Sequence, residues 1–475
     1  MKHLLNFFLF VLILVLFTAC PRKDEVNPDP DPEPQGDPET FTVNSWVNNN
    51  MLLYYYWNDK ISKNLKPDGF KDPNDFFEEH LYPTEDRWSW IMDDFEEYKK
   101  ELDGVPVTMG FSPAFGQFQN SDEVFFIVEY VYPGSPADLA GLKRGDIVLQ
   151  INNTNLDVNN YYSLYSGTSY TVSLGSIDNN TNTIGLNGKK ITMTAAVVEA
   201  DPAIFDSVIS VNGKMIGYLV YSDFTGGIDN VYLHNLGKKL GAMKTAGIDE
   251  LVIDLRYNPG GSIAAAQYFA SILAPAATVD ANSVLISLKF NAQYQEYLEK
   301  EFPDDLGYKF SSNPYNLDLD KVYFLTANGT ASASELIITG LDPYMDVVVI
   351  GENTHGKYTG ASVLYDAQEN PEHNWVMVPI TMKYANANGY TDFKNGLTPD
   401  YEVLDDGLWD AIPFGNTSDP IIAKAVELIT GQQPITRTKS AKAALNVEKI
   451  VPSQMELKRN LLVPLPKNQG ELIAN

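Results

Sequence analysis

Short runs of branched apolar residues recur in the second half of this chain, each followed by a turn and a segment with helical character. Residues 251–255 lead through a glycine turn into a predicted helix over residues 262–273. Residues 322–326 and 347–350 repeat the pattern. Runs of this length and composition are typical of strands that are covered on both faces. The repeated unit therefore predicts an α/β sheet domain, which we place at residues 205–431.

Within this domain, residues 328–357 carry the side chains best suited to chemistry. A small-residue turn holds Ser332 and Ser334, Glu335 follows them, and Lys357 lies on a glycine-flanked turn after the next predicted strand. A serine hydroxyl needs a neutral base to become a nucleophile, and a lysine serves only where burial lowers its pKa. The 25-residue spacing from Ser332 to Lys357 leaves room for one helix and one strand. The two loops can then converge, which predicts a serine nucleophile with a lysine base.

The part of the chain before the α/β domain divides into two further predicted units. Residues 41–103 are rich in aromatic residues and predict a small helical domain, with Asn44 or Ser45 as a helix cap. Large rings bury large areas, so we interpret the aromatic cluster as a core and not as a carbohydrate-binding platform. Residues 104–200 are rich in predicted strands, and residues 432–475 form a C-terminal extension without a predicted role.

The N-terminus has the features of an export signal. A short basic start precedes an apolar run that ends before Cys20, and this run is too short for a comfortable membrane span. Residues 1–19 resemble a bacterial lipoprotein signal, in which Cys20 becomes the lipidated first residue of the mature protein. Residues 20–40 are rich in proline and acidic residues, as in an extended tether. We therefore expect an exported lipoprotein of the bacterial cell envelope; the alternative is ordinary secretion with an incidental cysteine.

Composition excludes several classes of protein. The 34 basic and 62 acidic residues argue against nucleic acid as a partner, because phosphate binding needs basic patches. A single cysteine excludes intrachain disulfides and cysteine-rich zinc sites. The five histidines adopt no metal-ligand spacing, and the glycines lack the order of nucleotide-binding loops. We expect no metal and no cofactor.

Several motifs together carry a family resemblance. The turn at residues 328–335, with Gly356 and Lys357, resembles the active-site signature of the carboxy-terminal processing peptidases, the S41 serine peptidases. Residues 254–261 and 396–400 match further motifs of that family. The segment at residues 133–153, with a short helix capped at Ser135 and a turn into a predicted strand at 147–151, resembles a PDZ domain. Together these motifs imply a multidomain α/β (α+β) protein: a small helical domain, a β-rich PDZ-like domain and an α/β Ser-Lys peptidase domain.

The resemblance assigns roles within the turn. It makes Ser332, and not Ser334, the nucleophile, and Lys357 the general base. Glu335 matches a family residue that supports the dyad, although a solvent-facing helix glutamate is the alternative. In many members a glutamine stands four residues beyond the lysine, where this chain has Ala361.

The resemblance also places binding groups. The backbone N–H of Ala333, with one from Gly260 or Gly261, would form an oxyanion hole. In the PDZ-like domain an extended peptide would add as a strand, with its carboxylate held by a loop. The nearest match to that loop is Met109, Gly110 and Phe111.

Two residues near Lys357 allow other assignments within the site. His355 could form a Ser-His-Asp arrangement with Asp342 or Asp346, and Ser362 could take the place of the missing glutamine. For the function, we expect a cell-envelope serine endopeptidase that hydrolyses polypeptides near their carboxy termini through an acyl-enzyme. The alternative is a non-catalytic lipoprotein that binds peptides or glycans on a peptidase-like fold.

Overall fold

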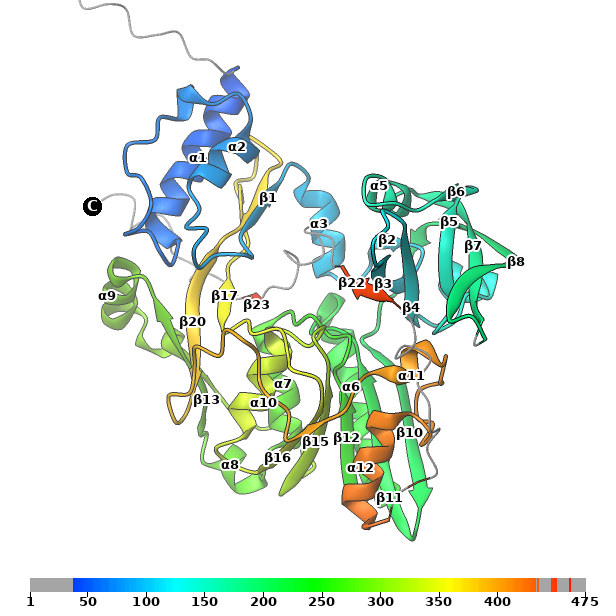
Figure 1. The fold of residues 1–475 in the computed structure, drawn as a ribbon. Coiled ribbons are helices and arrows are strands. Elements are labelled where there is room, and N and C mark those ends of the chain that lie inside the picture. The colour runs from blue at the N-terminus through cyan, green and yellow to red at the C-terminus, as the bar shows by residue number, and fades with distance from the viewer. Residues whose placement is uncertain (1–36, 179, 433, 435–445, 451–460, 463–475) are drawn as a thin grey trace, which may run out of the picture.

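The computed structural model describes residues 37–178, 180–432, 434, 446–450 and 461–462 of the 475-residue chain. The predicted signal segment and Cys20 lie outside the described residues. Figure 1 shows N-terminal helices, a β-rich unit and a larger α/β unit below them. In the described part of the chain, no helix has both the length and the apolar character needed to cross a membrane.

The α/β unit is built on a six-stranded sheet with the order β10-β11-β12-β15-β16-β21. From β11 to β21 all neighbours pair in parallel, and β10 pairs antiparallel with β11 at one edge. The predicted strands at 251–255, 322–326 and 347–350 are therefore confirmed as central strands. The strand bounds are β10 Ala203–Val211, β11 Lys214–Tyr221, β12 Glu250–Asp254, β15 Lys321–Thr326, β16 Asp346–Gly351 and β21 Tyr401–Glu402.

Helices cover both faces of this sheet, as continuous apolar strands require. Alternate strand residues such as Ile253 and Phe324 pack into one core with the helices of one face, whereas Val252 and Leu325 pack into another with α12. The helices of the first face are α6 Val231–Thr245, α7 Ile263–Leu273 and α10 Ala333–Leu341, and the second face holds α12 Pro420–Thr430. The remaining helices of this unit are α8 Ala276–Asp280, α9 Ala292–Glu301 and α11 Asp406–Trp409.

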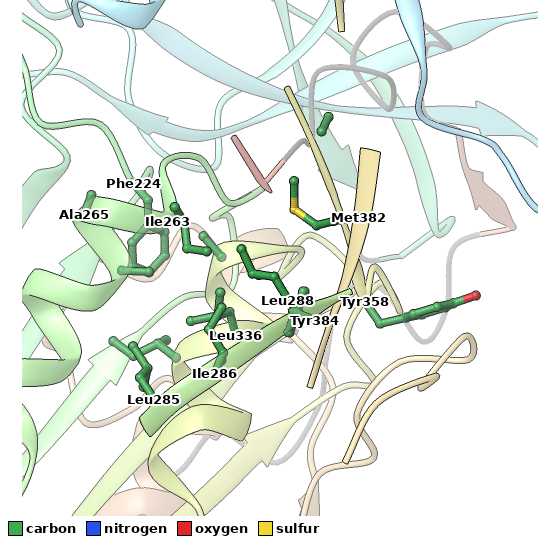
Figure 2. Close-up of a cluster of buried hydrophobic side chains, with 14 of the residues drawn as sticks. Phe224, Ile263, Ala265, Leu285, Ile286, Leu288, Leu336, Tyr358, Met382 and Tyr384 are labelled. Carbon is green, nitrogen blue, oxygen red and sulfur yellow. The ribbon is translucent and has the colours of Figure 1, made fainter. Parts of the chain in front are cut away.

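A second sheet, with the order β14-β13-β20-β17-β23, packs against α7 and α10. Figure 2 shows Leu336 of α10 among side chains of β13 and β20, with Tyr384 beside them. The strand that follows Lys357, β17, lies in this sheet, so the two catalytic candidates come from different layers. The bounds are β13 Val284–Phe290, β14 Gly307–Lys309, β17 Thr359–Ala361, β20 Ile380–Asn386 and β23 Leu461–Leu462.

The β-rich unit has the predicted PDZ-like order of elements. Ser135 caps α4, its side chain accepting a hydrogen bond from the N–H of Asp138, and Gly141 ends the helix in the left-handed conformation. The next strand, β5, spans the predicted residues 147–151. The elements are β3 Phe111–Phe118, β4 Val124–Val131, α4 Pro136–Ala140, β5 Ile147–Ile151, α5 Tyr161–Tyr165, β7 Ser169–Asp178 and β8 Thr183–Thr194, with the short pairs β2 Val107–Thr108 and β9 Ala196–Val197, and β6 Thr154–Asn155 on β5.

The N-terminal helices pack onto the α/β unit and share its core. Many of their aromatic rings, among them Phe76 and Trp88, are buried, and others pack against the same core, which confirms the core interpretation. The predicted cap at Asn44 or Ser45 is wrong: the first helix starts at Pro38, because Asp37 accepts from the N–H of Thr40 and proline suits the first position. The elements are α1 Pro38–Tyr54, α2 Pro73–Glu79, β1 Trp90–Met92 and α3 Phe95–Leu102; β1 pairs with β19 Val376–Val378, which also pairs with β18 Leu364–Tyr365.

Candidate active site

Ser332 lies at the start of α10, on the loop that leaves the central strand β15. Its backbone adopts φ 60° and ψ −112°, a conformation that residues other than glycine rarely adopt. The residue is fully buried, and its Oγ has no hydrogen-bond partner among the described residues. A strained serine whose hydroxyl is left without a partner at a helix start is the arrangement expected of a nucleophile.

The glycine turn after β12 lies directly against Ser332. Gly260 has φ +112°, and a Cβ there would stand 2.6 Å from the Cβ of Ser332 and 2.9 Å from the N atom of Ala333. Both the backbone angle and the close approach require glycine at this position. Two loops that are about 70 residues apart in the sequence therefore form one surface beside the serine hydroxyl.

The backbone donors around the hydroxyl are not equivalent. The N–H of Gly260 donates to Oδ1 of Asn258 at 2.9 Å, so this group is already used. Among the described hydrogen bonds, none has the N–H of Gly261 or of Ala333 as its donor. Ser334, the other serine of the turn, donates its hydroxyl to the carbonyl of Asn258 at 3.1 Å. Of the two predicted glycines, Gly261 is thus the one whose N–H has no acceptor among the described hydrogen bonds.

Glu335 joins the serine loop to the lysine loop. Its Oε2 accepts from the N–H of Ser332 and from the N–H of Lys357, each at 2.8 Å. Its Oε1 accepts from the N–H of Gly356 at 2.6 Å and from the hydroxyl of Thr354. Burial raises the pKa of Glu335, and the hydrogen bonds from these donors oppose that rise. The carboxylate is fully buried, so the alternative of a solvent-facing helix glutamate is wrong.

Tyr384 makes a second link between the same two residues, through their backbone carbonyls. Its hydroxyl, which comes from β20, donates towards the carbonyl of Ser332 at 3.3 Å and that of Lys357 at 3.2 Å. Burial raises the pKa of Tyr384 well above its usual value, so the hydroxyl stays protonated and remains a donor. Sequence reasoning missed this residue, because no spacing or motif connects it to the dyad.

Lys357 is fully buried, and its Nζ faces an aromatic ring from the N-terminal region. The Nζ lies 4.8 Å from the ring centroid of Trp88. The indole N–H of Trp88 donates to Nε2 of His355 at 3.2 Å, and its backbone N–H donates to Asp86 at 2.9 Å. The N-terminal helical region thus supplies one of the side chains that surround Lys357, and no motif or spacing predicts this contact.

The predicted alternative with His355 as a base is wrong. Its Nε2 is the acceptor for Trp88. Asp346 stands at the start of β16 in an ion pair with Lys321, whereas His355 follows the end of that strand. Asp342 lies at the C-terminal end of α10, and Ser332 lies at its N-terminal end. No Ser-His-Asp arrangement can form from these positions.

The position of the family glutamine is filled differently here. Ala361 is buried in β17, where its backbone pairs with Ile380. The hydroxyl of Ser362 bonds to that of Thr381 at 2.9 Å. Ser362 therefore has a partner on β20, and the structure gives no sign that it replaces the glutamine.

The three predicted peptide-binding residues lie in the PDZ-like unit, away from the two sheets that carry the dyad. The carbonyl of Met109 accepts from the N–H of Ala137, and that of Gly110 accepts from the hydroxyl of Ser135 at 3.1 Å. Phe111 begins β3 and stacks on Phe126. The loop is thus fixed to the start of α4, with β3 leading away from it.

A buried network of ion pairs holds Arg256, which lies in the segment that leads into the glycine turn. The guanidinium of Arg256 contacts Asp254 at 2.7 Å, Asp405 at 2.7 Å and Asp419 at 3.0 Å. Arg144 of the PDZ-like unit stacks 5.1 Å over the neighbouring ring of Tyr257. The turn that approaches Ser332 is therefore tied both to the central sheet and to the PDZ-like unit.

Three family models match successive parts of this chain. The sequence model described as "Peptidase family S41" matches residues 215–403, that of the "Peptidase S41 N-terminal domain" matches 42–90, and that of the PDZ domain matches 127–170. A carboxyl-terminal-processing protease of Picosynechococcus is 24% identical over 345 residues, which cover 72% of this chain and 73% of that protein. The carboxy-terminal processing protease CtpA of Bacillus subtilis is 24% identical over 323 residues, covering 67% and 61%. The crystal structure of a putative S41 protease from Bacteroides fragilis superposes with a TM-score of 0.66 at 28% identity and covers 81% of this chain and 97% of that one.

Proposed function

The chain belongs to peptidase family S41, and from this premise we propose that it is a serine endopeptidase in which Ser332 is the nucleophile and Lys357 the general base. The family membership supports a protease role. The residue assignment rests on the site: a buried serine hydroxyl without a partner among the described residues, and a buried lysine whose backbone is held by the same carboxylate. Full burial is the condition that a lysine base requires.

The proposed reaction has two halves. The neutral amine of Lys357 takes the proton of Ser332 Oγ as the oxygen attacks the scissile carbonyl carbon, and the amide C–N bond then breaks as the lysine returns that proton to the leaving amine. A water molecule, deprotonated by the same amine, cleaves the ester and regenerates the serine. The N–H groups of Ala333 and Gly261 receive the negative oxygen in both halves, and donors of this kind contribute about 3 kcal/mol each.

The observation that carries the proposal is the shared carboxylate oxygen of Glu335. An oxygen that accepts from the backbones of both Ser332 and Lys357 at 2.8 Å fixes the two residues relative to each other. Positioning of this kind is a large part of catalysis, since small misplacements of reacting groups are costly. Glu335 contacts neither substrate nor the reacting atoms in this scheme, so its role is to position the dyad.

Labelling of the folded protein with a serine-directed fluorophosphonate tests the proposal. We expect stoichiometric modification at Ser332, located by mass spectrometry, together with cleavage of an unstructured protein such as casein. Ser332→Ala should lose both, with a nearly unchanged melting temperature, and Ser334→Ala should keep the label at Ser332. Absence of labelling in a folded protein that binds peptides would instead support the non-catalytic binding function.

We further propose that the peptidase is exported and anchored in the bacterial cell envelope through a lipid on Cys20, and that its substrates are polypeptides. The support for the anchor is the sequence of residues 1–40 alone. Cys20→Ser should move the protein from the membrane fraction to the soluble fraction of the cell envelope. Retention of that variant in the membrane fraction would contradict the lipid anchor.

A further inference from the structure

Two short segments of the C-terminal extension add strands to the PDZ-like sheet and to the sheet that contains β17. The first is β22, Val447–Lys449, which pairs antiparallel with β3, the edge strand of the PDZ-like sheet. The pairing continues on both sides, because Gln119 N–H donates to the carbonyl of Asn446 at 3.0 Å and Ile450 N–H donates to that of Phe115 at 3.1 Å. An extended peptide bound by strand addition would make the same kind of contacts.

The direction of this segment and one of its side chains fit a bound peptide. From Val447 to Ile450 the chain runs along β3 towards Phe111, where the predicted carboxylate loop begins. The side chain of Ile450 packs against the PDZ core, whose partly buried members include Tyr161 and Tyr165 of α5. The segment therefore supplies both elements of this recognition mode: backbone pairing for affinity and an apolar side chain in contact with the core.

The second segment, β23, lies beside the dyad. It pairs in parallel with β17, where Gly360 faces Leu461 and Ala361 faces Leu462. On its other side, Leu462 N–H donates to the carbonyl of Gly261 at 3.0 Å. The segment thus adds a strand between the strand that follows Lys357 and the glycine turn, whose Gly260 lies against Ser332. An extended substrate that bound here by strand addition would compete with it.

We propose that these two segments, residues 446–450 and 461–462, act as an internal ligand of the same molecule. They occupy the edge of β3, where a peptide would dock, and the edge of β17, where a substrate would reach Ser332. A polypeptide must therefore displace them before it is cleaved. The expected effect on cleavage rests on the proposed peptidase function. The docking of the two segments does not depend on that function. A ligand that belongs to the same chain acts at an effective concentration on the order of mM. A polypeptide at a lower concentration enters only if it binds more tightly than the internal segments.

A disulfide lock tests the docking directly. Val447 and Phe118 face each other in the antiparallel register, and the hydrogen bonds at Asn446 and Ile450 make theirs a non-hydrogen-bonded pair with close side chains. The variant Val447→Cys with Phe118→Cys, in a chain that also carries Cys20→Ser, should form an intramolecular disulfide under mild oxidation. Absence of that disulfide in the folded chain would overturn the proposal, whether or not the protein is a peptidase.

The same variant measures the effect on activity. We expect the oxidised form to cleave casein at least tenfold more slowly than the reduced form, and a reducing agent to restore the rate. The single variant Val447→Cys should show no dependence on the reducing agent. An oxidised form as active as the reduced form would overturn the competition between segment and substrate. The competition would also be overturned if the protein cleaved off these segments in a reaction that requires Ser332, because the segments would then be substrates and not a retained ligand.

A matched pair at Leu462 separates the backbone contact from the side chain. Leu462→Pro removes the N–H that donates to Gly261, whereas Leu462→Ala keeps it. We expect kcat/KM for casein to rise about fivefold or more in the proline variant and less in the alanine variant; equal values for wild type and proline variant would contradict the block. If no form cleaves casein or takes the fluorophosphonate label, the proposed function fails, and the disulfide lock alone decides the docking.

Discussion

The backbone amides of Ser332 and Lys357 donate to one carboxylate oxygen, Oε2 of Glu335, at the same distance of 2.8 Å. The two residues come from separate layers of the fold, one at the start of α10 and the other just before β17. A single buried acceptor between them means that neither loop can shift without disturbing the other.

Replacement of Glu335 by Gln tests this coupling. The amide nitrogen of glutamine would face two N–H or O–H donors, and each buried donor left without an acceptor costs about 1–3 kcal/mol. We expect kcat to fall about 100-fold or more and the melting temperature to drop by several degrees. Thr354→Val, which removes only one of the four donors, should have a smaller effect on kcat. An unchanged kcat in the glutamine variant would show that the dyad does not depend on this contact.

Gly260 offers a test of the approach between the glycine turn and the serine. Alanine there would place its Cβ 2.6 Å from the Cβ of Ser332 and 2.9 Å from the N atom of Ala333, in addition to the strain at φ +112°. We expect Gly260→Ala to abolish casein cleavage. The control is Gly247→Ala, which has a similar strain at φ +77° but no atom within 4 Å of the new Cβ. It should lose about 1 kcal/mol of stability and keep its activity. Activity in the Gly260 variant would contradict the described packing.

The local motif could be predicted from the sequence because its geometry is local. Ser332 and Glu335 lie three residues apart at the start of a helix, and the apolar run after them leads to Lys357 through one strand. In a parallel sheet, the loops that follow neighbouring strands meet at the same edge. Spacing and pattern therefore sufficed for the α/β sheet and for the choice of candidate residues.

The rest of the site depends on contacts between distant segments. Trp88 bonds to His355 across 267 positions of sequence, and nothing in its surroundings distinguishes it from the other buried rings of its region. The strand at Val447–Lys449 has few residues and a mixed composition, and it is a strand only because an edge of the PDZ-like sheet pairs with it. Such elements carry no periodic signal of their own, so pattern reasoning cannot find them.

Trp88 is expected to matter for activity through its ring. Trp88→Ala would open the space over the Nζ of Lys357 and leave a buried cavity, which costs about 3–5 kcal/mol of stability. Trp88→Phe keeps an aromatic face, with a smaller ring, and loses the N–H that donates to His355. At a temperature well below both melting points, we expect kcat to fall at least tenfold in the alanine variant and to recover largely in the phenylalanine variant. An equal fall in kcat in both variants would mean that activity does not depend on the aromatic face over the Nζ of Lys357.

We expect Asp223 to make the stability of the protein depend on pH. It follows β11, and burial, with a smaller effect from Glu101, raises the pKa of Asp223 from 3.8 to about 7. Between these values the folded state holds more protons than the unfolded state, so the free energy of unfolding falls as the pH rises from about 4 to about 7. The contribution of this group becomes constant about one pH unit above the pKa of the folded state.

Asp223→Asn should remove that dependence, because an amide does not titrate. We expect the melting temperature of the wild type to fall between pH 5 and pH 7 more steeply than that of the variant, and the two curves to run parallel above about pH 8. Differential scanning fluorimetry in buffers of equal ionic strength measures both curves. Asp229→Asn, at a residue just before α6, serves as the control for the loss of one carboxylate and should follow the wild-type curve. Parallel curves for wild type and Asp223→Asn across the whole range would show that Asp223 is ionised at pH 5 and does not hold its proton in the folded state.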